Sequence, residues 1–397
     1  MNKTEFKTVN DKIIISICGK LDSSNAASVE DEINEYVKNN PHNSVTADFE
    51  NLEYISSAGL RVMLRLRKEE ADFNIINASG EVYDILDMTG FTEMIPVKKA
   101  YRKVSVDGCK VIGEGATGVV YRLDDDIIVK VYYESNALPD IHRERELARK
   151  AFVLGIPTAI PFDVVKVGEK YGSVFELLKA KSMAELIIEN PADLDKYIDI
   201  SVDLMKKLHS TEVKEDDLPP IKNKALGVAE YLKDRIPEDK AQKFKKMAEE
   251  IPDTLNMVHA DLHIKNMMIQ NGELLLIDMD TLSRGHPLFE LEAIYQAYLG
   301  YSEIDKNNTY EFFGIKHEVA VEIWNKTLRR YLGTDDEKYV VEVENKVKLM
   351  AYASLYKCFT STGEEPEGDE KRRVDAYMNY ILTLIDIVES FTFDVKL

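Results

Sequence analysis

Residues 257–280 organise the larger part of the chain, and they read MVHADLHIKNMMIQNGELLLIDMD. Two short apolar runs flank an Asn-Gly turn, a pattern that predicts a β-hairpin. Polar side chains stand just before the first run and at the end of the second. We therefore expect Asp261, Asn266 and Asp278 to converge at one end of the hairpin. Carboxylate and amide oxygens gathered in this way suit a hard cation and a general base.

A glycine-rich segment lies upstream, at residues 111–121, VIGEGATGVVY. Its GxGxxG pattern, which also occurs in dinucleotide-binding loops, is formed by Gly113, Gly115 and Gly118. A dinucleotide loop must open a helix, whereas this one runs into a β-branched stretch, an acidic turn and the stretch 127–132, IIVKVY. Strand, turn and strand indicate a glycine loop folded over phosphates, with Lys130 in the second strand placed to contact them.

A lysine in that position needs a carboxylate partner. The helix expected from about 140 to 153, ended by Gly155 and Pro157, offers two candidates, Glu144 and Glu146. Further helices are expected at 193–209, 225–249, 318–331, 337–359 and 371–388, with an acidic loop at 363–369.

Residues 259–266, HADLHIKN, resemble the His-Gly-Asp-Leu-His-x-x-Asn motif of the aminoglycoside phosphotransferase and choline kinase families, with Ala260 in place of the glycine. The resemblance covers about residues 104–390. It implies a bilobal protein-kinase-like fold, with a first lobe at about 104–180 and a second at about 181–397. It also implies ATP and Mg²⁺ as cosubstrate and cofactor.

The resemblance implies roles residue by residue. Asp261 would be the catalytic base, His263 would lie near the transferring phosphate, and Asn266 and Asp278 would hold Mg²⁺. The spacing to Gly155 favours Glu144 over Glu146 as the partner of Lys130. The remaining expected roles are adenine binding by the backbone around Glu176 and Leu178, anchoring of the catalytic loop by Glu290, support of that loop by His259, and packing by His209.

The first hundred residues alternate between strand and helix patterns, which indicates an α/β domain with one central sheet. Strands are expected at 12–18, 45–49 and 73–76, and helices at 26–37, 57–70 and 81–88. The helix at 26–37 is expected to be capped by residues 22–24. The motifs GKLD at 19–22 and SSAGL at 56–60 resemble the STAS domain of anti-sigma-factor antagonists, over about residues 3–98.

The STAS resemblance implies that Ser57 is a regulatory phosphoacceptor. Ser56 stands where that family often has an aspartate. A phosphate on Ser57 would lie at a helix amino terminus, near free backbone N–H groups. The alternative from the residues alone is that Ser56 and Ser57 simply cap the helix.

The composition bounds the function. The 397 residues carry a formal net charge of −20, which disfavours nucleic acid and anionic membrane as partners. Cys18, Cys109 and Cys358 match no metal or redox spacing and are expected to be reduced thiols. Residues 1–10 have no signal-peptide core and no apolar run is long enough to span a bilayer, so a cytoplasmic location is expected.

The sequence thus predicts an α/β STAS-like domain at 1–98, a short basic connector, and an α+β kinase-like domain at 104–397. The expected function is ATP- and Mg²⁺-dependent phosphate transfer to a hydroxyl of an acceptor, either a protein or a small molecule. Two alternatives stay open. One is a signalling switch that binds a partner such as an anti-sigma factor and is regulated at Ser57. The other is a kinase for a small molecule such as an aminoglycoside or choline.

Overall fold

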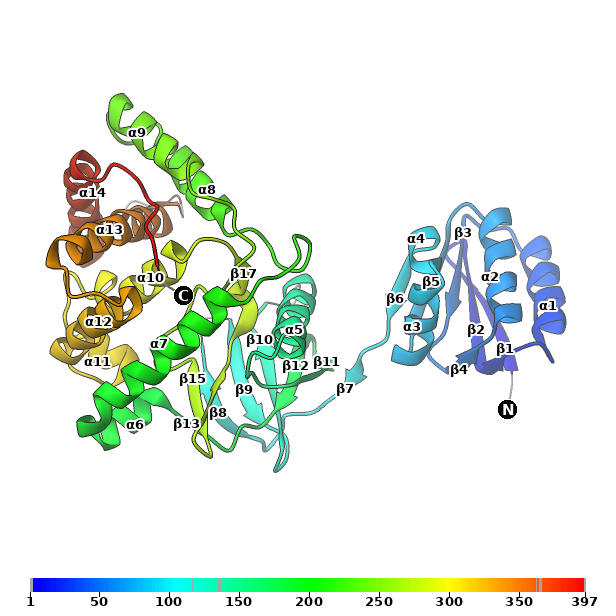
Figure 1. Cartoon of the computed structure of the whole chain (residues 1–397). Coiled ribbons are helices and arrows are strands. Elements are labelled where there is room, and N and C mark those ends of the chain that lie inside the picture. The colour runs from blue at the N-terminus through cyan, green and yellow to red at the C-terminus, as the bar shows by residue number, and fades with distance from the viewer. Residues whose placement is uncertain (1–2, 116, 135–136, 362, 364–365, 396–397) are drawn as a thin grey trace. The chain divides into compact units, whose positions relative to one another are not determined.

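The computed structural model describes residues 3–115, 117–134, 137–361, 363 and 366–395 (Figure 1). The chain divides into two compact units. The first comprises Met1–Asp107 with Val164–Gly172, and the second comprises Gly108–Asp163 with Ser173–Leu397. The division falls a few residues after the expected domain boundary. It adds residues 164–172 to the first unit, where Val165 and Lys166 pair with the strand β7 (Arg102–Lys103).

The first unit contains one mixed sheet with the strand order β1-β2-β3-β5-β6, and β4 pairs with β2. The β1–β2 pair is antiparallel and the other pairs are parallel. The strands are β1 (Lys3–Val9), β2 (Lys12–Leu21), β3 (Ser44–Asp48), β4 (Leu52–Ile55), β5 (Phe73–Ala78) and β6 (Val97–Lys99). The helices are α1 (Ala26–Asn39), α2 (Ser57–Glu69), α3 (Gly80–Met88) and α4 (Phe91–Met94).

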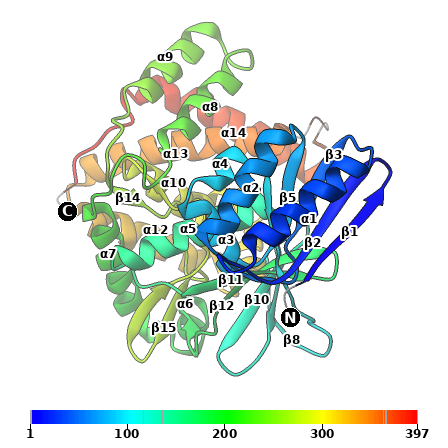
Figure 2. The same cartoon turned by 90° about the vertical axis from the view of Figure 1, so that its right-hand side faces the viewer.

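Alternate residues of β2 point into the core of this unit. Ile13, Ile15 and Ile17 are buried, as strand periodicity requires. The helices α1 and α2 lie side by side in both views (Figures 1 and 2). The expected cap of α1 was wrong: the N-cap residue is Asn25, and its side chain accepts from the N–H of Asp22 and donates to the carbonyl of Lys20. Asp22 instead accepts a hydrogen bond from Ser24, one residue outside the helix.

Gly59, in the first turn of α2, lies where no side chain fits. A Cβ atom at this position would be 2.7 Å from the carbonyl oxygen of Leu21 and 2.9 Å from a side-chain carbon of Ile55. We expect Gly59→Ala to lower the free energy of unfolding of the first unit by about 1–3 kcal/mol, since backbone must move to admit the methyl group. Chemical denaturation followed by circular dichroism measures this change.

Gly80→Ala is the matched control, because Gly80 also lies in the first turn of a helix of the same unit. Its added Cβ would meet only the end of the Lys99 side chain, at 3.7 Å. Alanine is favoured over glycine in a helix, so this variant should be neutral or slightly stabilising. Equal destabilisation by both substitutions would contradict the close-packing argument.

The strands that start the second unit belong to a six-stranded sheet with the order β7-β11-β12-β10-β9-β8, in which β8–β9 and β9–β10 pair antiparallel and β7–β11 pair parallel. As expected, strands follow the glycine-rich segment rather than a helix. These elements are β8 (Lys110–Glu114), β9 (Gly118–Arg122), β10 (Ile127–Tyr132), α5 (Leu138–Val153), β11 (Pro161–Val167) and β12 (Lys170–Glu176).

The rest of the second unit is mostly helical. Its helices are α6 (Met183–Glu189), α7 (Leu194–Ser210), α8 (Lys222–Leu232), α9 (Glu238–Glu249), α10 (Leu288–Tyr295), α11 (Asn308–Phe313), α12 (His317–Leu332), α13 (Glu337–Thr360) and α14 (Gly368–Ile387). A π-helical turn, Gln296–Gly300, follows α10. Its short strands are β13 (Lys181–Ser182), β14 (Met257–Val258), β15 (Met267–Gln270), β16 (Glu273–Leu276) and β17 (Ser283–Arg284).

The helix expected at 225–249 is two helices, α8 and α9. Pro237 is the N-cap residue of α9, whereas α8 already ends at Leu232. The proline disfavours one continuous helix through this position, because its ring cannot continue a helical hydrogen-bond ladder. The acidic loop expected at 363–369 includes Glu364 and Glu365, which lie outside the described residues. The three cysteines are free thiols. In the described part of the chain, no helix has the length and apolar character that crossing a membrane requires.

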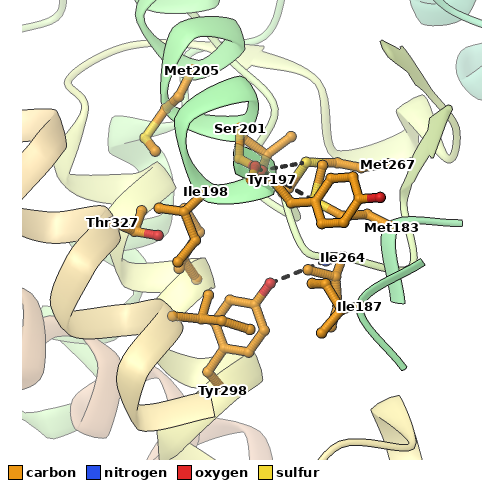
Figure 3. A pocket seen from close by; sticks show the side chains of 13 residues that line it. Met183, Ile187, Tyr197, Ile198, Ser201, Met205, Ile264, Met267, Tyr298 and Thr327 are labelled. Carbon is orange, nitrogen blue, oxygen red and sulfur yellow. Dashed lines mark hydrogen bonds between the residues drawn. The ribbon is translucent and has the colours of Figure 1, made fainter. Parts of the chain in front are cut away.

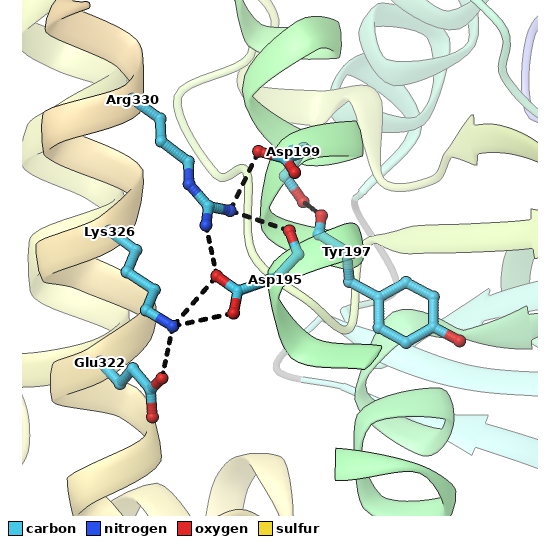
Figure 4. A network of polar contacts seen from close by, with 7 residues as sticks. Asp195, Tyr197, Asp199, Glu322, Lys326 and Arg330 are labelled. Atoms are coloured by element: carbon cyan, nitrogen blue, oxygen red, sulfur yellow. Dashed lines mark hydrogen bonds and ion pairs between the residues drawn. The ribbon is translucent and has the colours of Figure 1, made fainter. Parts of the chain in front are cut away.

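A polar network joins α7 to α12 (Figure 4). Asp195 of α7 accepts from Lys326 at 3.0 Å and from Arg330, both of α12. Arg330 also pairs with Asp199 at 3.0 Å, and Lys326 with Glu322 at 2.7 Å. These side chains are partly exposed, so each pair contributes little stability alone. Together they fix the register of α12 on α7.

Candidate active site

The expected hairpin is present and carries the candidate catalytic loop on its amino-terminal side. The strands β15 and β16 pair antiparallel, from Met267 opposite Leu276 to Gln270 opposite Glu273. Asn271 and Gly272 connect them with positive φ angles of 54° and 86°, the conformation that the Asn-Gly pair favours in two-residue hairpin turns. The N–H of Ile277 donates to the carbonyl of Asn266, which brings the end of β16 back to the start of β15.

Asp261 and Asn266, two of the three residues expected to converge, are in direct contact within the loop before β15. The Asn266 Nδ2 group donates to Asp261 Oδ2 at 2.8 Å and to the Asp261 carbonyl at 3.0 Å. The side-chain N–H groups of Asn266 are therefore both used in hydrogen bonds to Asp261. Its side-chain oxygen, Oδ1, is the atom that could bind a cation. Asp261 keeps its second oxygen, Oδ1, which lies 3.7 Å from His263 Nε2.

Lys130 binds two carboxylates. Its Nζ atom lies 3.1 Å and 3.3 Å from the two oxygens of Glu144 and 3.2 Å from Asp278 Oδ1. Glu144 is buried, whereas Glu146 lies on the surface and pairs with Arg149. Burial alone would lower the pKa of Lys130, but the charges of Glu144 and Asp278 raise it above its ordinary value. The ammonium group is therefore charged, and its contact with Asp278 connects strand β10 to the end of the β15–β16 hairpin.

Tyr132 is a further member of this cluster that the sequence did not single out. It lies two residues after Lys130 on the same face of β10, and its hydroxyl donates to Glu144 Oε2 at 2.5 Å. Burial and the charge of Glu144 raise the pKa of Tyr132, so the phenol stays protonated and remains a donor. Both oxygens of Glu144 are thus occupied, and its orientation towards Lys130 is fixed.

Negative charge is concentrated around Asp278. Burial, followed by the charge of Asp278, raises the pKa of Asp261 to about 7 and that of Asp280 to about 6. Asp261, Asp278 and Asp280 thus bring three carboxyl groups into one region, in which Lys130 contacts Asp278, and a divalent cation bound there would neutralise negative charge. Among the described residues no three His, Cys, Asp or Glu side chains form a ready metal cage.

The backbone of the catalytic loop is held by side chains, of which Glu290 and Tyr298 are buried. Glu290 of α10 accepts from the N–H groups of His259 and Ala260 at 2.7 Å and 3.1 Å. The Thr281 hydroxyl donates to the carbonyl of His259, and the Tyr298 hydroxyl accepts from the N–H of Ile264 at 3.1 Å. The geometry at Glu290 is the anchoring contact that the sequence led us to expect.

His263 is buried rather than open to solvent. Its ring packs edge-on against Phe312 and Phe313, with centroid distances of 5.6 Å and 5.4 Å. Burial lowers its pKa to about 4, so the ring is neutral at pH 7 and brings no positive charge to a phosphate. The structure places His263 beside Asp261. The expected location of His263 near a transferring phosphate stays a prediction.

The three glycines of the loop between β8 and β9 differ in what surrounds them. A Cβ on Gly118 would lie 2.3 Å from the carbonyl oxygen of Val131, whereas one on Gly115 would have nothing within 4 Å and one on Gly113 only ordinary contacts. Ala116, within the loop, lies outside the described residues. The fold itself therefore requires glycine at 118 and leaves room at 115 for a ligand to approach the backbone.

We expect Gly118→Ala to destabilise the second unit by about 1–3 kcal/mol, because β9 and β10 must separate to admit the methyl group. Gly115→Ala should leave stability within about 0.5 kcal/mol of the parent and raise the KM for ATP, since the added methyl group points into open space. Thermal unfolding and nucleotide titration of the two variants separate these effects. A Gly115 variant that unfolds as readily as the Gly118 variant would contradict this distinction.

The segment after β12 has a backbone N–H group that is free to bind an adenine ring. The N–H of Leu177 donates to the carbonyl of Asp126 at 2.7 Å, and that of Glu176 to Ile160 at 3.1 Å. The N–H of Leu178 makes no hydrogen bond to another described residue. Glu176 places its own carboxylate 3.4 Å from the N–H of Ile160, so its side chain is used within the protein.

In the first unit, the structure separates Ser56 from Ser57 with respect to helix capping, one of the two roles that the sequence suggested for this pair. Ser56 is the N-cap residue of α2, and its side chain accepts from the N–H of Ala58 at 3.2 Å. Ser57 is the first residue of the helix and is exposed. Capping therefore occupies Ser56 and leaves the hydroxyl of Ser57 open to solvent.

The structure contains two hollows among the described residues. A void of about 20 Å³ lies in the core of the helical part, between α7, α6 and the catalytic loop (Figure 3). It is lined mainly by apolar side chains and has room for about one water molecule, so it is no substrate pocket. An open hollow of about 620 Å³ in the first unit is lined by Glu50, Asn51, Leu52, Glu53, Ser79, Gly80 and Glu81.

The residues of the catalytic loop and the lysine cluster fall within a known family. A family model for the phosphotransferase enzyme family, APH, matches residues 108–308, which is just over half of the chain. The chain belongs to this family. A second model, for the STAS domain, matches residues 3–104. The predicted fold class, a STAS α/β domain followed by a protein-kinase-like fold, is thereby confirmed.

Similar proteins divide between the two domains. The STAS domain is similar to a provisionally named anti-sigma factor antagonist, BtrV of Bordetella bronchiseptica, with 29% identity over 99 residues, or 24% of this chain and 84% of that protein. The APH domain is similar to a thermostable mutant of aminoglycoside phosphotransferase APH(4)-Ia, with 11% identity and a TM-score of 0.48 over 70% of this chain and 94% of that one.

Two further solved structures are similar. Amicoumacin kinase hAmiN in complex with AMP-PNP, Ca²⁺ and Ami has 16% identity and a TM-score of 0.46, over 79% of this chain and 95% of that one. An anti-sigma factor antagonist from Mycobacterium paratuberculosis has 19% identity and a TM-score of 0.23, over 25% of this chain and 86% of that one.

Proposed function

We propose that the APH domain transfers the γ-phosphate of ATP to a hydroxyl group of an acceptor, in a reaction that requires Mg²⁺. The observation that carries this proposal is the cluster in which Lys130 contacts both Glu144 and Asp278, next to the contact between Asp261 and Asn266. Phosphoryl transfer needs a cationic side chain that binds phosphate, a base, and oxygen ligands for a metal ion, and this cluster contains all of these groups. The STAS domain is proposed to regulate this activity or to transmit it.

Each residue has a proposed task. Lys130, held by Glu144 and Tyr132, binds phosphate oxygens of the nucleotide. The backbone of the loop at Gly113–Gly118 covers the phosphates, and Leu178 N–H binds the adenine. Asp261 accepts the proton of the acceptor hydroxyl as its oxygen bonds to the γ-phosphorus and the bond from that phosphorus to the β,γ-bridging oxygen breaks, which releases ADP. The raised pKa of Asp261 suits a group that must take up a proton near neutral pH.

Asn266 Oδ1 and Asp278 would hold Mg²⁺, with Asp280 adding negative charge nearby. When bound, the metal neutralises charge that develops on the phosphate oxygens. In the structure Asp278 is engaged with Lys130 at 3.2 Å, so binding of the metal–nucleotide complex must share or replace that contact. The rate gain would come from positioning and from stabilisation of charge.

We expect AMP-PNP with Mg²⁺ to stabilise the second unit, and AMP-PNP with EDTA to do so much less. A ligand present at 100 times its Kd raises the free energy of unfolding by about 2.7 kcal/mol. Asp278→Asn should remove most of the Mg²⁺-dependent part of this gain, because it removes a metal-binding charge. Differential scanning fluorimetry measures all four combinations. Stabilisation that is equal with and without Mg²⁺ would contradict the proposed metal site.

A second candidate function is a signalling switch in which the APH domain phosphorylates Ser57, in the same chain or in a related one. The observation in its favour is that Ser57 is exposed at the first position of α2 while Ser56 performs the capping. A phosphate there would add about two negative charges to a surface that could bind an anti-sigma factor. Phosphosite mapping after incubation with Mg-ATP tests this, and an unlabelled Ser57 counts against it.

A third candidate is phosphorylation of a small molecule, such as an aminoglycoside or choline. Titrating such acceptors in a coupled assay for ADP separates the candidates, because a small-molecule kinase would show acceptor-dependent turnover and the signalling switch would not. The net charge of −20 favours cationic acceptors by attraction at long range. A cytoplasmic location stays a prediction.

A further inference from the structure

The catalytic loop contains an alanine in a conformation that favours glycine. Ala260 has φ of 63°, in the left-handed region, where a Cβ atom is crowded by the following peptide. Such a residue costs about 1–2 kcal/mol and persists only where its surroundings hold it. The next residue is Asp261, so this turn sets the direction in which the proposed base points.

The two hydrogen bonds that Glu290 accepts from the N–H groups of His259 and Ala260 are what hold the turn. Glu290 is completely buried, and burial alone would raise its pKa. Its interactions with His209, together with the charge of His259 and that N–H bond, hold the pKa below the ordinary value. The carboxylate therefore stays ionised, and what supports it decides how firmly the turn is held.

That support comes from two buried residues far away in the sequence. His209, at the end of α7, has its Nε2 atom 3.6 Å from Glu290 Oε2, which is longer than a hydrogen bond, and Nε2 has no hydrogen-bond partner among the described residues. Its Nδ1 atom lies 2.6 Å from the hydroxyl of Tyr331 in α12. All three side chains are completely buried. Because Glu290 can only accept, the consistent arrangement has Nε2–H directed at Glu290 and Nδ1 accepting from the Tyr331 hydroxyl.

Neither His209 nor Tyr331 can easily turn away from this arrangement. The His209 carbonyl accepts from the Asn256 side chain at 2.8 Å, just before the catalytic segment. Tyr331 follows Arg330, which belongs to the polar network between α12 and α7 (Figure 4). The two helices that carry the histidine and the tyrosine are thus fixed to each other.

We propose that His209 and Tyr331 are positioning residues for phosphate transfer, acting through Glu290 to hold Ala260 in its left-handed turn and so to aim Asp261. This inference rests on the proposed function for its effect on turnover. Its structural part, the coupling between Tyr331 and the turn at Ala260, can be tested whether or not the enzyme turns over.

The test uses Tyr331→Phe, which removes one hydroxyl and keeps the ring, in the parent and in an Ala260→Gly background. In the parent we expect turnover to fall about tenfold, while the KM for ATP stays within about twofold. The substitution disturbs the orientation of the Asp261 carboxylate and leaves the ATP-binding residues in place. Glycine needs no help to stay left-handed, so in the Ala260→Gly background the same change should cost only about two- to threefold. Equal losses in the two backgrounds would overturn the proposal.

Hydrogen–deuterium exchange gives a second readout that needs no activity. Tyr331→Phe should speed exchange of the His259 and Ala260 amides by about tenfold, because those N–H groups are released when Glu290 is less well held. Tyr339→Phe is the control, since that hydroxyl bonds to the carbonyl of Asp394 at 2.7 Å, outside the loop. Unchanged exchange in Tyr331→Phe overturns the coupling. Absent turnover in the parent, with faster exchange in the variant, would contradict only the proposed function.

Discussion

The variant Asp261→Asn is expected to transfer phosphate about 10²- to 10⁴-fold more slowly than the parent, the range that loss of a general base gives. The amide has the shape of the carboxylate and can still accept from Asn266 Nδ2, so the loop should keep its form. The KM for ATP should change little, because Lys130 and the glycine loop remain. Initial rates of ADP formation at several ATP concentrations measure both quantities.

Asp234→Asn is the matched control, because Asp234 is an exposed aspartate of the same unit. It should retain the parent rate. An Asp261→Asn variant that keeps the parent rate would remove Asp261 from the chemistry and with it the proposed base.

The same variant has a further consequence for stability that depends on pH. The folded-state pKa of Asp261, about 7, lies above its ordinary value of 3.8, so the folded protein holds a proton that the unfolded chain releases. The contribution of this group to stability therefore falls as the pH rises from about 4 to about 7. In the absence of metal, Asp261→Asn should be more stable than the parent at pH 8 and show less advantage at pH 4.

The variant Lys130→Met is expected to lose both stability and nucleotide affinity. It leaves the buried carboxylate of Glu144 with only the Tyr132 hydroxyl and leaves Asp278 without its ammonium partner. Removing one partner of a buried ion pair costs about 3–5 kcal/mol. Loss of the charged contact to phosphate should weaken ATP binding by about 10- to 100-fold, since such bonds contribute about 1.5–3 kcal/mol. Thermal unfolding and isothermal titration calorimetry measure the two effects.

Lys245→Met provides the comparison for this second prediction. Lys245 also pairs with a glutamate, Glu249, but the pair lies on the surface of α9 and should contribute less than about 1 kcal/mol. Equal losses of stability in the two methionine variants would show that burial of the Lys130 cluster adds nothing. Unchanged ATP affinity in Lys130→Met would remove that residue from the nucleotide site.

The parts of this structure that could be predicted from sequence are those with a local signal. An Asn-Gly turn between apolar runs marks the β15–β16 hairpin, and a hairpin brings its ends together, as the hydrogen bond from Ile277 N–H to the Asn266 carbonyl shows. The order of strand, helix and strand in the first unit follows from the same kind of periodicity. The spacing to Gly155 favoured Glu144 over Glu146, and the structure, in which Glu144 is buried and contacts Lys130, agrees with that choice.

The residues that escaped prediction act over distances that no local pattern records. His209 and Tyr331 are separated by 122 positions, and only the packing of α7 on α12 brings them together. Tyr132 occupies an ordinary strand position whose hydroxyl acquires a role from α5. The break at Pro237 differs from these, since a proline within a helical pattern is a local signal, and it was available in the sequence.

The measurement that tests the central claim most directly follows the γ-phosphate itself. The protein is incubated with γ-³²P-labelled ATP, Mg²⁺ and a protein-free metabolite extract supplemented with aminoglycosides and choline, and the labelled products, the protein included, are separated. A Mg²⁺-dependent product other than orthophosphate, formed by the parent and lost in Asp261→Asn, is the result we predict. Label that stays in ATP, or reaches only orthophosphate at the same rate in both proteins, would contradict the assignment of a phosphotransferase.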